Sequence, residues 1–241
     1  MPYLSRIWLN PFRTGAQRML RNPQILHAAV LQGLCGDAAD ERVLWRLDTE
    51  NPRRAAVLVL TDRRPSWEHL VEQAGWPSAD EPQALIRGYE PLLAQIARGR
   101  EFAFRVRANP VSSTRHPLNP SATQKEQLAA SPRPRGVRVP HRTAKHQLAW
   151  LLDHTQQWGF EIPAATAGEP DVLITARQRL DFTKRTSDSG KRRVVIETAT
   201  FEGRLRVHDP DTFRQSLLAG VGRARAYGCG LITLAPLSAG R

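Results

Sequence analysis

The stretch EFAFRVRANP, residues 101–110, alternates between two kinds of side chain over most of its length. One set is apolar and the other is mostly basic: Phe102, Phe104 and Val106 against Ala103, Arg105 and Arg107. Successive side chains of a strand point to opposite faces of its sheet, so strict alternation predicts a strand with one buried face. We therefore expect residues 101–110 to form a strand whose second face is basic.

Outward from this strand, the second half of the chain reads strand, helix, strand, strand, helix, strand. The first helix, in residues 143–160, has Thr143 as a cap, and the second has Asp209 as a cap with Pro210 at its first helical position. Two strand-like runs flank a charged tip, DFTKRTSDSGKR, and LITLAP ends the series. This order is the split βαβ plan of a ferredoxin-like domain, which is also the plan of the RNA recognition motif (RRM).

The first half follows the same order in residues 3–75, except that no final strand is recognisable. Its first helix is marked by Asn22 as N-cap, Pro23 at the first helical position and Gly36 as a terminating glycine. The predicted fold is therefore α+β, with two tandem ferredoxin-like (RRM-like) βαββαβ domains at residues 1–98 and 99–241. The second domain includes a surface stretch rich in proline and arginine at about residues 109–141.

Charge and apolar content restrict the class of partner. The chain has 35 Lys and Arg against 23 Asp and Glu, a formal net charge of +12, which favours nucleic acid or another polyanion. Its best apolar run, AAVLVL at residues 55–60, is far too short to span a membrane, and the first residues lack the order of a signal peptide. Cys35 and Cys229 have no metal-ligand spacing. We expect a cytoplasmic protein without metal or cofactor.

A glycine-rich segment, GVGRARAYGCG at residues 220–230, follows a predicted helix and precedes a predicted strand. A dinucleotide fingerprint needs the opposite order and a third glycine where Arg225 stands, so that interpretation fails. Gly220 and Gly222 would instead let backbone N–H groups approach a phosphate, while Arg223 and Arg225 add charge. The alternative is a tight turn that packs under the sheet.

Two further basic segments are candidates for RNA binding. The predicted strand hairpin carries five cations at its tip, and the proline-rich stretch carries a second group: Lys184, Arg185, Lys191, Arg192 and Arg193, then Arg133, Arg135 and Arg138. A cationic hairpin can reach the phosphates of a duplex groove, and phosphate contacts dominate affinity for nucleic acid. The alternative for both segments is a solvated loop.

Several motifs, taken in order along nearly the whole chain, resemble the CasE family, the CRISPR RNA-processing endoribonucleases of type I-E systems. They are YLSRIWLNPFR, ILHAAV, RANPV, HQLAWLL, FEGRLRVHDPDTF and AGVGRARAYGCGLITLAP. The resemblance implies two ferredoxin-like domains and metal-independent cleavage of precursor CRISPR RNA at the 3′ base of the repeat stem-loop. It also implies that the protein stays on the processed RNA as a Cascade subunit beside other subunits. We expect a monomer when it is free.

The same resemblance identifies His27 as the candidate catalytic residue, because the family carries its active histidine in this helix. Histidine suits proton transfer and charge stabilisation near neutral pH. Family members often have tyrosine and lysine where this chain has Gln24 and Gln32. Gln24 shares a helix face with His27 and can donate a hydrogen bond to a phosphoryl oxygen, so it is the second candidate.

Three functions stay open at this point. The first is a repeat endoribonuclease that leaves a 2′,3′-cyclic phosphate. The second is a catalytically weak or inactive RNA-binding subunit, suggested by Gln24 and Gln32. The third is a single-strand binder of RRM type, in which Phe102 and Phe104 would stack bases, although we expect these two rings to be core.

Overall fold

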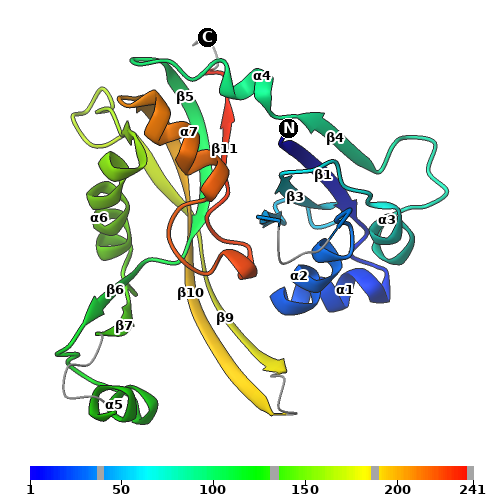
Figure 1. The fold of residues 1–241 in the computed structure, drawn as a ribbon. Helices are drawn as coiled ribbons and strands as arrows, with labels where there is room; N and C mark the ends of the chain where they lie inside the picture. The colour runs from blue at the N-terminus through cyan, green and yellow to red at the C-terminus, as the bar shows by residue number, and fades with distance from the viewer. Residues whose placement is uncertain (37–40, 131–135, 186–189, 238–241) are drawn as a thin grey trace.

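The computed structural model describes residues 1–36, 41–130, 136–185 and 190–237 (Figure 1). It has a mixed α+β architecture with two main antiparallel sheets, one in each half of the chain. The first half contains β1 (Tyr3–Leu9), α1 (Thr14–Arg21), α2 (Pro23–Leu31), β2 (Leu44–Asp48), β3 (Ala55–Thr61), α3 (Glu68–Ala74) and β4 (Ala84–Gly88). Its sheet has the strand order β2-β3-β1-β4.

The second half contains β5 (Glu101–Ala108), α6 (Ala144–Thr155), β9 (Val172–Arg185), β10 (Lys191–Val207), α7 (Pro210–Ala219) and β11 (Ile232–Ala235). Shorter elements are α4 (Glu90–Leu93), η1 (Gln156–Trp158), β8 (Phe160–Glu161) and η2 (Arg225–Tyr227). The sheet runs β11-β5-β10-β8, and β9 also pairs with β10. The strand expected at residues 101–110 is confirmed as the sheet's second strand, and its rings Phe102 and Phe104 are buried.

Side-chain caps begin three of the helices where the sequence predicts them. The Asn22 side chain accepts a hydrogen bond from the backbone N–H of Gln24, and Thr143 caps α6 in the same manner. Asp209 accepts from the N–H groups of Asp211 and Thr212. Each cap satisfies an N–H group that has no partner within the helix, and thereby fixes where the helix begins.

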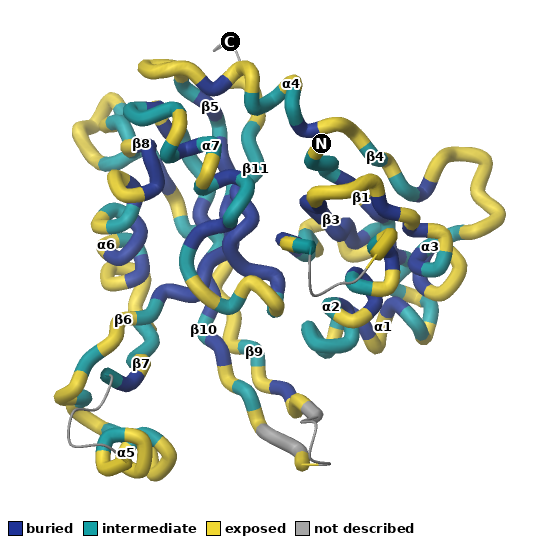
Figure 2. The backbone as a smooth tube through the Cα atoms, in the orientation of Figure 1, coloured by how far each residue is buried: buried dark blue, intermediate teal, exposed yellow. Residues whose placement is uncertain are grey.

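The described residues form two hydrophobic cores, one within the first half and one shared by the two halves. Alternate residues of β2 and β3 face opposite ways, so Trp45 and Val57 pack under α1–α3 while Leu44, Leu58 and Leu60 pack against the second half. Both faces of β3 are therefore covered, which explains its continuous apolar sequence. The shared core fixes the position of one sheet relative to the other (Figure 2).

Several segments differ from the sequence-based expectation. The sequence analysis does not predict α1, and α2 ends at Leu31 with Gln32 as its C-cap, so Gly36 does not terminate it. The missing strand of the first half is β4, whose mixed burial gives it no clear alternation. The proline-rich stretch is not wholly irregular: β6 (Val111–Thr114) pairs with β7 (Val137–Pro140), and α5 (Ala122–Ala129) lies between them. A capping box joins Ser121 and Gln124 at the start of α5. These elements are too short to show a period in the sequence.

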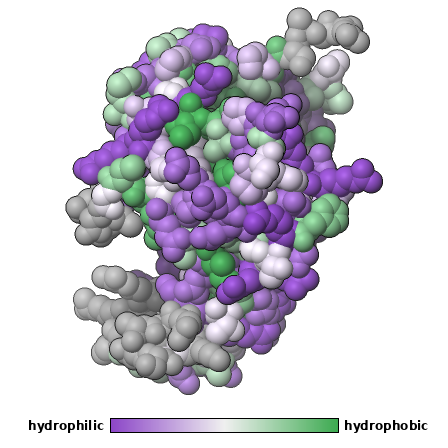
Figure 3. Space-filling view, turned by 90° about the vertical axis from the view of Figure 1, so that its right-hand side faces the viewer, coloured by the Kyte–Doolittle hydropathy of each residue, from purple (hydrophilic) through white to green (hydrophobic). Residues whose placement is uncertain are grey.

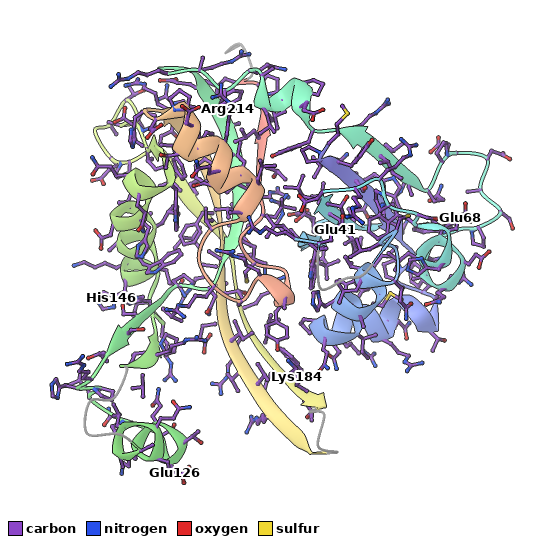
Figure 4. All side chains as sticks on the ribbon, in the orientation of Figure 1. Glu41, Glu68, Glu126, His146, Lys184 and Arg214 are labelled. Carbon is purple, nitrogen blue, oxygen red and sulfur yellow. The ribbon has the colours of Figure 1, made fainter. Side chains whose placement is uncertain are left out.

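The strands β9 and β10 are unusually long, at 14 and 17 residues, and together form an arm that extends past the sheet (Figure 1). The pairing shifts register between Thr200 and Phe201. The described end of the arm brings Lys184 of β9 opposite Arg192 of β10. Basic residues of the predicted hairpin are thus carried away from the sheet, on the side of the molecule where α2 lies (Figure 4). The space-filling view of the right-hand side of Figure 1 shows many hydrophilic residues with hydrophobic ones scattered among them (Figure 3).

Candidate active site

His27 lies on α2 and is half-buried. The indole Nε1 of Trp45, on β2, donates a hydrogen bond of 3.3 Å to its Nδ1. The two ring planes differ by 21° and their centroids are 6.5 Å apart. Nearly parallel planes with this nitrogen-to-nitrogen distance describe two rings lying edge to edge. One imidazole nitrogen is therefore engaged by the protein, and Nε2 has no partner among the residues that the structure describes.

The surroundings of His27 lower the pKa of its imidazole. The main cause is burial, which disfavours the charged form, and the positive charge of Lys184 acts in the same direction. Lys184 is exposed near the end of β9, where Figure 4 shows it on the arm below α2. The arm of the second half thus brings a cation to the histidine of the first half.

The glycine-rich segment packs against the two elements that carry His27 and Trp45. Its short helix η2 lies against α2 and β2. A Cβ atom added to Gly228 would come within 2.7 Å of the Trp45 ring, and one added to Gly220 within 2.5 Å of Leu44. The backbone approaches tryptophan and leucine side chains at these positions, so the glycines here serve packing. The packed-turn alternative describes Gly220 and Gly228 well.

The exposed part of the same segment has a different character. The N–H groups of Gly220 and Gly230 donate to Ser216 and Arg107, whereas in the described chain none of the N–H groups from residue 222 to 226 has a partner. Gly222 and Ala224 have φ of +67° and +61°, on either side of Arg223. Arg223 and Arg225 are exposed. Gly222, Arg223 and Arg225 are thus available to an anion, and Gly220 is not.

The other predicted RNA contacts are placed unequally. Arg193 is exposed but forms a two-point ion pair with Asp181, with Nε to Oδ1 at 2.8 Å. Arg185, Lys191 and Arg192 lie in the paired ends of β9 and β10. Arg138 is exposed on β7, while Arg133 and Arg135 lie outside the described residues. The half-buried Gln24 is on α2 with His27.

A cleft of about 420 Å³ lies between the two halves beside this site. Its walls come from α1, α2, β2, η2 and the C-terminal sheet, and they include Pro23, Leu26, Trp45, Asp48, Glu50, Arg107, Glu202 and Tyr227. The carboxylates of Glu50 and Glu202 are paired with Arg105, so the mouth of the cleft is not a simple acidic patch. Among the described residues, no three His, Cys, Asp or Glu side chains converge to hold a metal ion.

Sequence reasoning missed Trp45 and Tyr227. Trp45 is 1% exposed and contacts His27. Tyr227 lines the cleft beside α2, and its ring lies tilted against that of Phe182, with centroids 4.9 Å apart. Trp45 belongs to none of the quoted motifs, and Tyr227 lies in the glycine-rich segment, where the glycines and arginines were the candidates. Their contacts depend on how β2 and η2 meet α2, which no local pattern shows.

Comparison with known proteins decides the family. Residues 2–236 match the family described as CRISPR associated protein. The chain belongs to this family. A relative from Thermus thermophilus, the CRISPR-associated endoribonuclease Cse3, is 30% identical over 97% of this chain and all of its own length. The Cascade subunit CasE of Escherichia coli is 25% identical over 80% of this chain and 89% of its own.

A solved structure supports the same assignment. The fold is similar to that of CRISPR endoribonuclease Cse3 bound to a 19-nucleotide RNA, with a TM-score of 0.71 and 28% identity. That match covers 97% of this chain and all of the solved one. The Cse3/CasE resemblance predicted from the motifs is thereby confirmed. In the described part of this CRISPR-associated protein, no helix is long and apolar enough to cross a membrane.

Proposed function

We propose that this protein is a metal-independent endoribonuclease that binds the repeat stem-loop of precursor CRISPR RNA. It cleaves at the 3′ base of the stem, leaves a 2′,3′-cyclic phosphate, and stays bound as a cytoplasmic Cascade subunit. The observation that carries the proposal is the packing of η2, with the exposed Arg223 and Arg225 beside it, against the helix of His27, whose pKa the charge of Lys184 also lowers. The similarity to Cse3 supports the same activity.

The fold proposed for this function is a pair of ferredoxin-like domains, residues 1–98 and 99–241. The order β2-β3-β1-β4 in the first sheet supports it, because that fold places its outer strands in this way. The order β11-β5-β10 with β9 on β10 supports the same plan in the second sheet. Two such folds packed through one core leave a junction, and the candidate site lies at that junction.

The chemistry needs little from the protein beyond geometry and charge. The 2′-hydroxyl of the RNA is the nucleophile, and it must be aligned with the scissile bond while negative charge develops on phosphorus oxygens and on the leaving oxygen. His27 offers an N–H or a lone pair at Nε2, and Lys184 offers a positive charge. Gln24 can donate a hydrogen bond to a phosphoryl oxygen but cannot exchange protons usefully.

RNA binding is assigned to two surfaces of the second half. The arm presents Lys184, with Arg185, Lys191, Arg192 and Arg193 in its paired strands, and the glycine-rich segment presents Gly222, Arg223 and Arg225. Unpartnered N–H groups next to left-handed residues form a concave nest that suits a phosphate. Phe102 and Phe104 are buried, which argues against a base-stacking sheet and favours a folded stem as the ligand.

The decisive experiment incubates a repeat hairpin with the protein in the presence of EDTA. We expect one cut 3′ of the stem, a cyclic phosphate end, and a loss of about 10²- to 10⁴-fold in rate for His27→Ala, with binding retained. Binding should weaken by orders of magnitude over a few-fold rise in salt. A cut that requires added divalent metal, or that persists in His27→Ala, would contradict the proposal.

A second candidate is an RNA-binding subunit with weak or no catalysis. Gln24 favours it, because no proton-transferring side chain joins His27 on that helix face. This alternative predicts tight binding of the hairpin with no cut by either the wild type or His27→Ala. A preference for unstructured RNA over the stem would instead favour a single-strand binder.

A further inference from the structure

The hydrogen bond between Trp45 and His27 constrains where the imidazole can carry its proton. An indole N–H is a donor and never an acceptor, so the Nδ1 that it contacts must present a lone pair. In a neutral imidazole the single proton then resides on Nε2. We propose that Trp45 is a positioning residue that holds His27 as the Nε2–H tautomer, so that His27 meets the RNA as a hydrogen-bond donor and not as a proton acceptor. This rests on the proposed function.

Trp45 is well placed to impose this state because it cannot move away. It is 1% exposed and belongs to the core under α1–α3. The backbone of Gly228 lies against its six-membered ring so closely that a Cβ there would come within 2.7 Å. The edge-to-edge geometry of the two rings directs the indole N–H at Nδ1. The glycine-rich segment thus holds Trp45, and Trp45 holds the histidine.

The surroundings of α2 also disfavour the positively charged form of His27. A proton on Nδ1 would point at the indole N–H, so the imidazolium is disfavoured together with the Nδ1–H tautomer. Burial and Lys184 lower the pKa of His27 further. The elements around α2 carry these titratable or charged residues: Arg18 and Arg21 on α1, His69 on α3, Arg225 and Tyr227 on η2, and Lys184 on β9. His69 is engaged with the Ala29 carbonyl.

The proton balance of the cleavage step follows. A neutral imidazole that lost its Nε2 proton would become a negatively charged imidazolate, which is unfavourable near neutral pH. His27 therefore keeps its proton and only donates a hydrogen bond to the developing oxyanion. Hydroxide from the solvent removes the 2′-hydroxyl proton, the 2′-oxygen bonds to phosphorus, and the bond from phosphorus to the 5′-oxygen breaks. Water then protonates the 5′-oxygen and regenerates hydroxide. No group of the protein changes its protonation state.

The first test measures the tautomer without requiring activity. Nitrogen NMR of the free protein should show a pyridine-like Nδ1 and a pyrrole-like Nε2 for neutral His27. In Trp45→Phe the proton affinity of His27 should rise about three- to tenfold, the net worth of one lost hydrogen bond. Trp67→Phe is the matched control, since Trp67 lies in the same core and its Nε1 has no partner among the described residues.

Comparing the two variants separates the loss of the Trp45 hydrogen bond from a general loosening of the core. An equal rise in Trp67→Phe would indicate a loosened core and overturn the proposal, as would a neutral His27 with its proton on Nδ1. Because this measurement uses no RNA, it stands even if the wild type proves unable to cut.

The second test is the pH dependence of single-turnover cleavage. A donor role predicts that the wild-type rate keeps rising with hydroxide concentration through the pH at which His27 titrates. A general base predicts a plateau above that pH, and a plateau absent from His27→Gln would overturn the proposal. In Trp45→Phe, where a lone pair on Nε2 becomes accessible, we expect an inflection that Trp67→Phe does not show.

Discussion

Arg46 on β2 donates a hydrogen bond of 2.8 Å from Nη1 to the hydroxyl oxygen of Thr233 on β11, 187 positions later in the chain. The same nitrogen contacts the backbone oxygen of Arg105 at 2.9 Å, and Asp48 accepts from the other side of the guanidinium. Arg46 is 3% exposed, so the group is satisfied entirely by protein atoms. This buried network joins the sheets of the two halves through β2, β5 and β11.

Replacing Arg46 by methionine should therefore weaken the whole fold. The change removes bonds to two strands of the second half and leaves Asp48 with Arg105 at 3.5 Å as its remaining cation. We expect a loss of about 2–4 kcal/mol in the free energy of unfolding, because a buried polar group loses its partner. Urea denaturation measures it. Arg87→Met, at an exposed position of β4, is the control, and equal midpoints for the two variants would contradict the expectation.

Removing the charge of Lys184 should affect His27 and cleavage together. Lys184→Ala is expected to raise the pKa of His27, because a positive charge that disfavours the imidazolium is lost. Cleavage should slow by about 10- to 100-fold through lost stabilisation of the oxyanion. NMR titration and single-turnover assays give the two values. Lys145→Ala, at an exposed site on α6, should leave both unchanged; a matching effect there would point to net charge alone.

Gly228→Ala tests how the glycine-rich segment supports the site. Its φ is +80°, and the new methyl group would meet the Trp45 ring. We expect about 2–4 kcal/mol of destabilisation, from left-handed backbone strain together with overpacking, and a shifted His27 resonance. Gly99 has a φ of +79°, and a Cβ added there would have no atom within 4 Å. The stability lost in Gly99→Ala therefore measures the cost of backbone strain without overpacking. If both variants lose the same stability, contact with Trp45 is unimportant.

Stability should depend on pH through His27. Its pKa is lower in the folded chain than the ordinary 6.5, so the unfolded chain binds more protons as the pH falls. The contribution of His27 to the free energy of unfolding is therefore fully present above about pH 6.5. It is lost as the pH falls from 6.5 toward the lower pKa that His27 has in the folded chain. His141, whose pKa is also lowered by burial, acts in the same direction. Urea midpoints between pH 8 and pH 5 should fall less for His27→Gln than for the wild type; parallel curves would exclude His27 as a contributor.

The sequence predicts those parts of the fold that short-range patterns encode. Alternation locates β5, and the caps Asn22, Thr143 and Asp209 locate three helix starts, because both signals depend on neighbours within a turn or a strand. It does not reveal β4, which has a mixed burial pattern at the edge of its sheet.

The sequence names candidate residues for the site but does not predict their contacts. His27 and Lys184 are candidates from sequence, but their proximity depends on how the arm of one half passes α2 of the other. Trp45 and Arg46 are adjacent on β2 and point to opposite faces, one toward the histidine and one toward β5 and β11 of the second half. A periodic pattern can mark such a strand, but it cannot say what each face will meet.

The placement of η2 and the arm has a consequence for the order in which the protein becomes competent during synthesis. His27 emerges from the ribosome early. Lys184, whose charge acts on the imidazole, and Gly228, whose backbone lies against Trp45, emerge late. A nascent chain that carries only the N-terminal sheet is thus incomplete as a nuclease. On the proposed mechanism, the chain can cleave RNA only after β11 has paired with β5 and η2 has packed against α2.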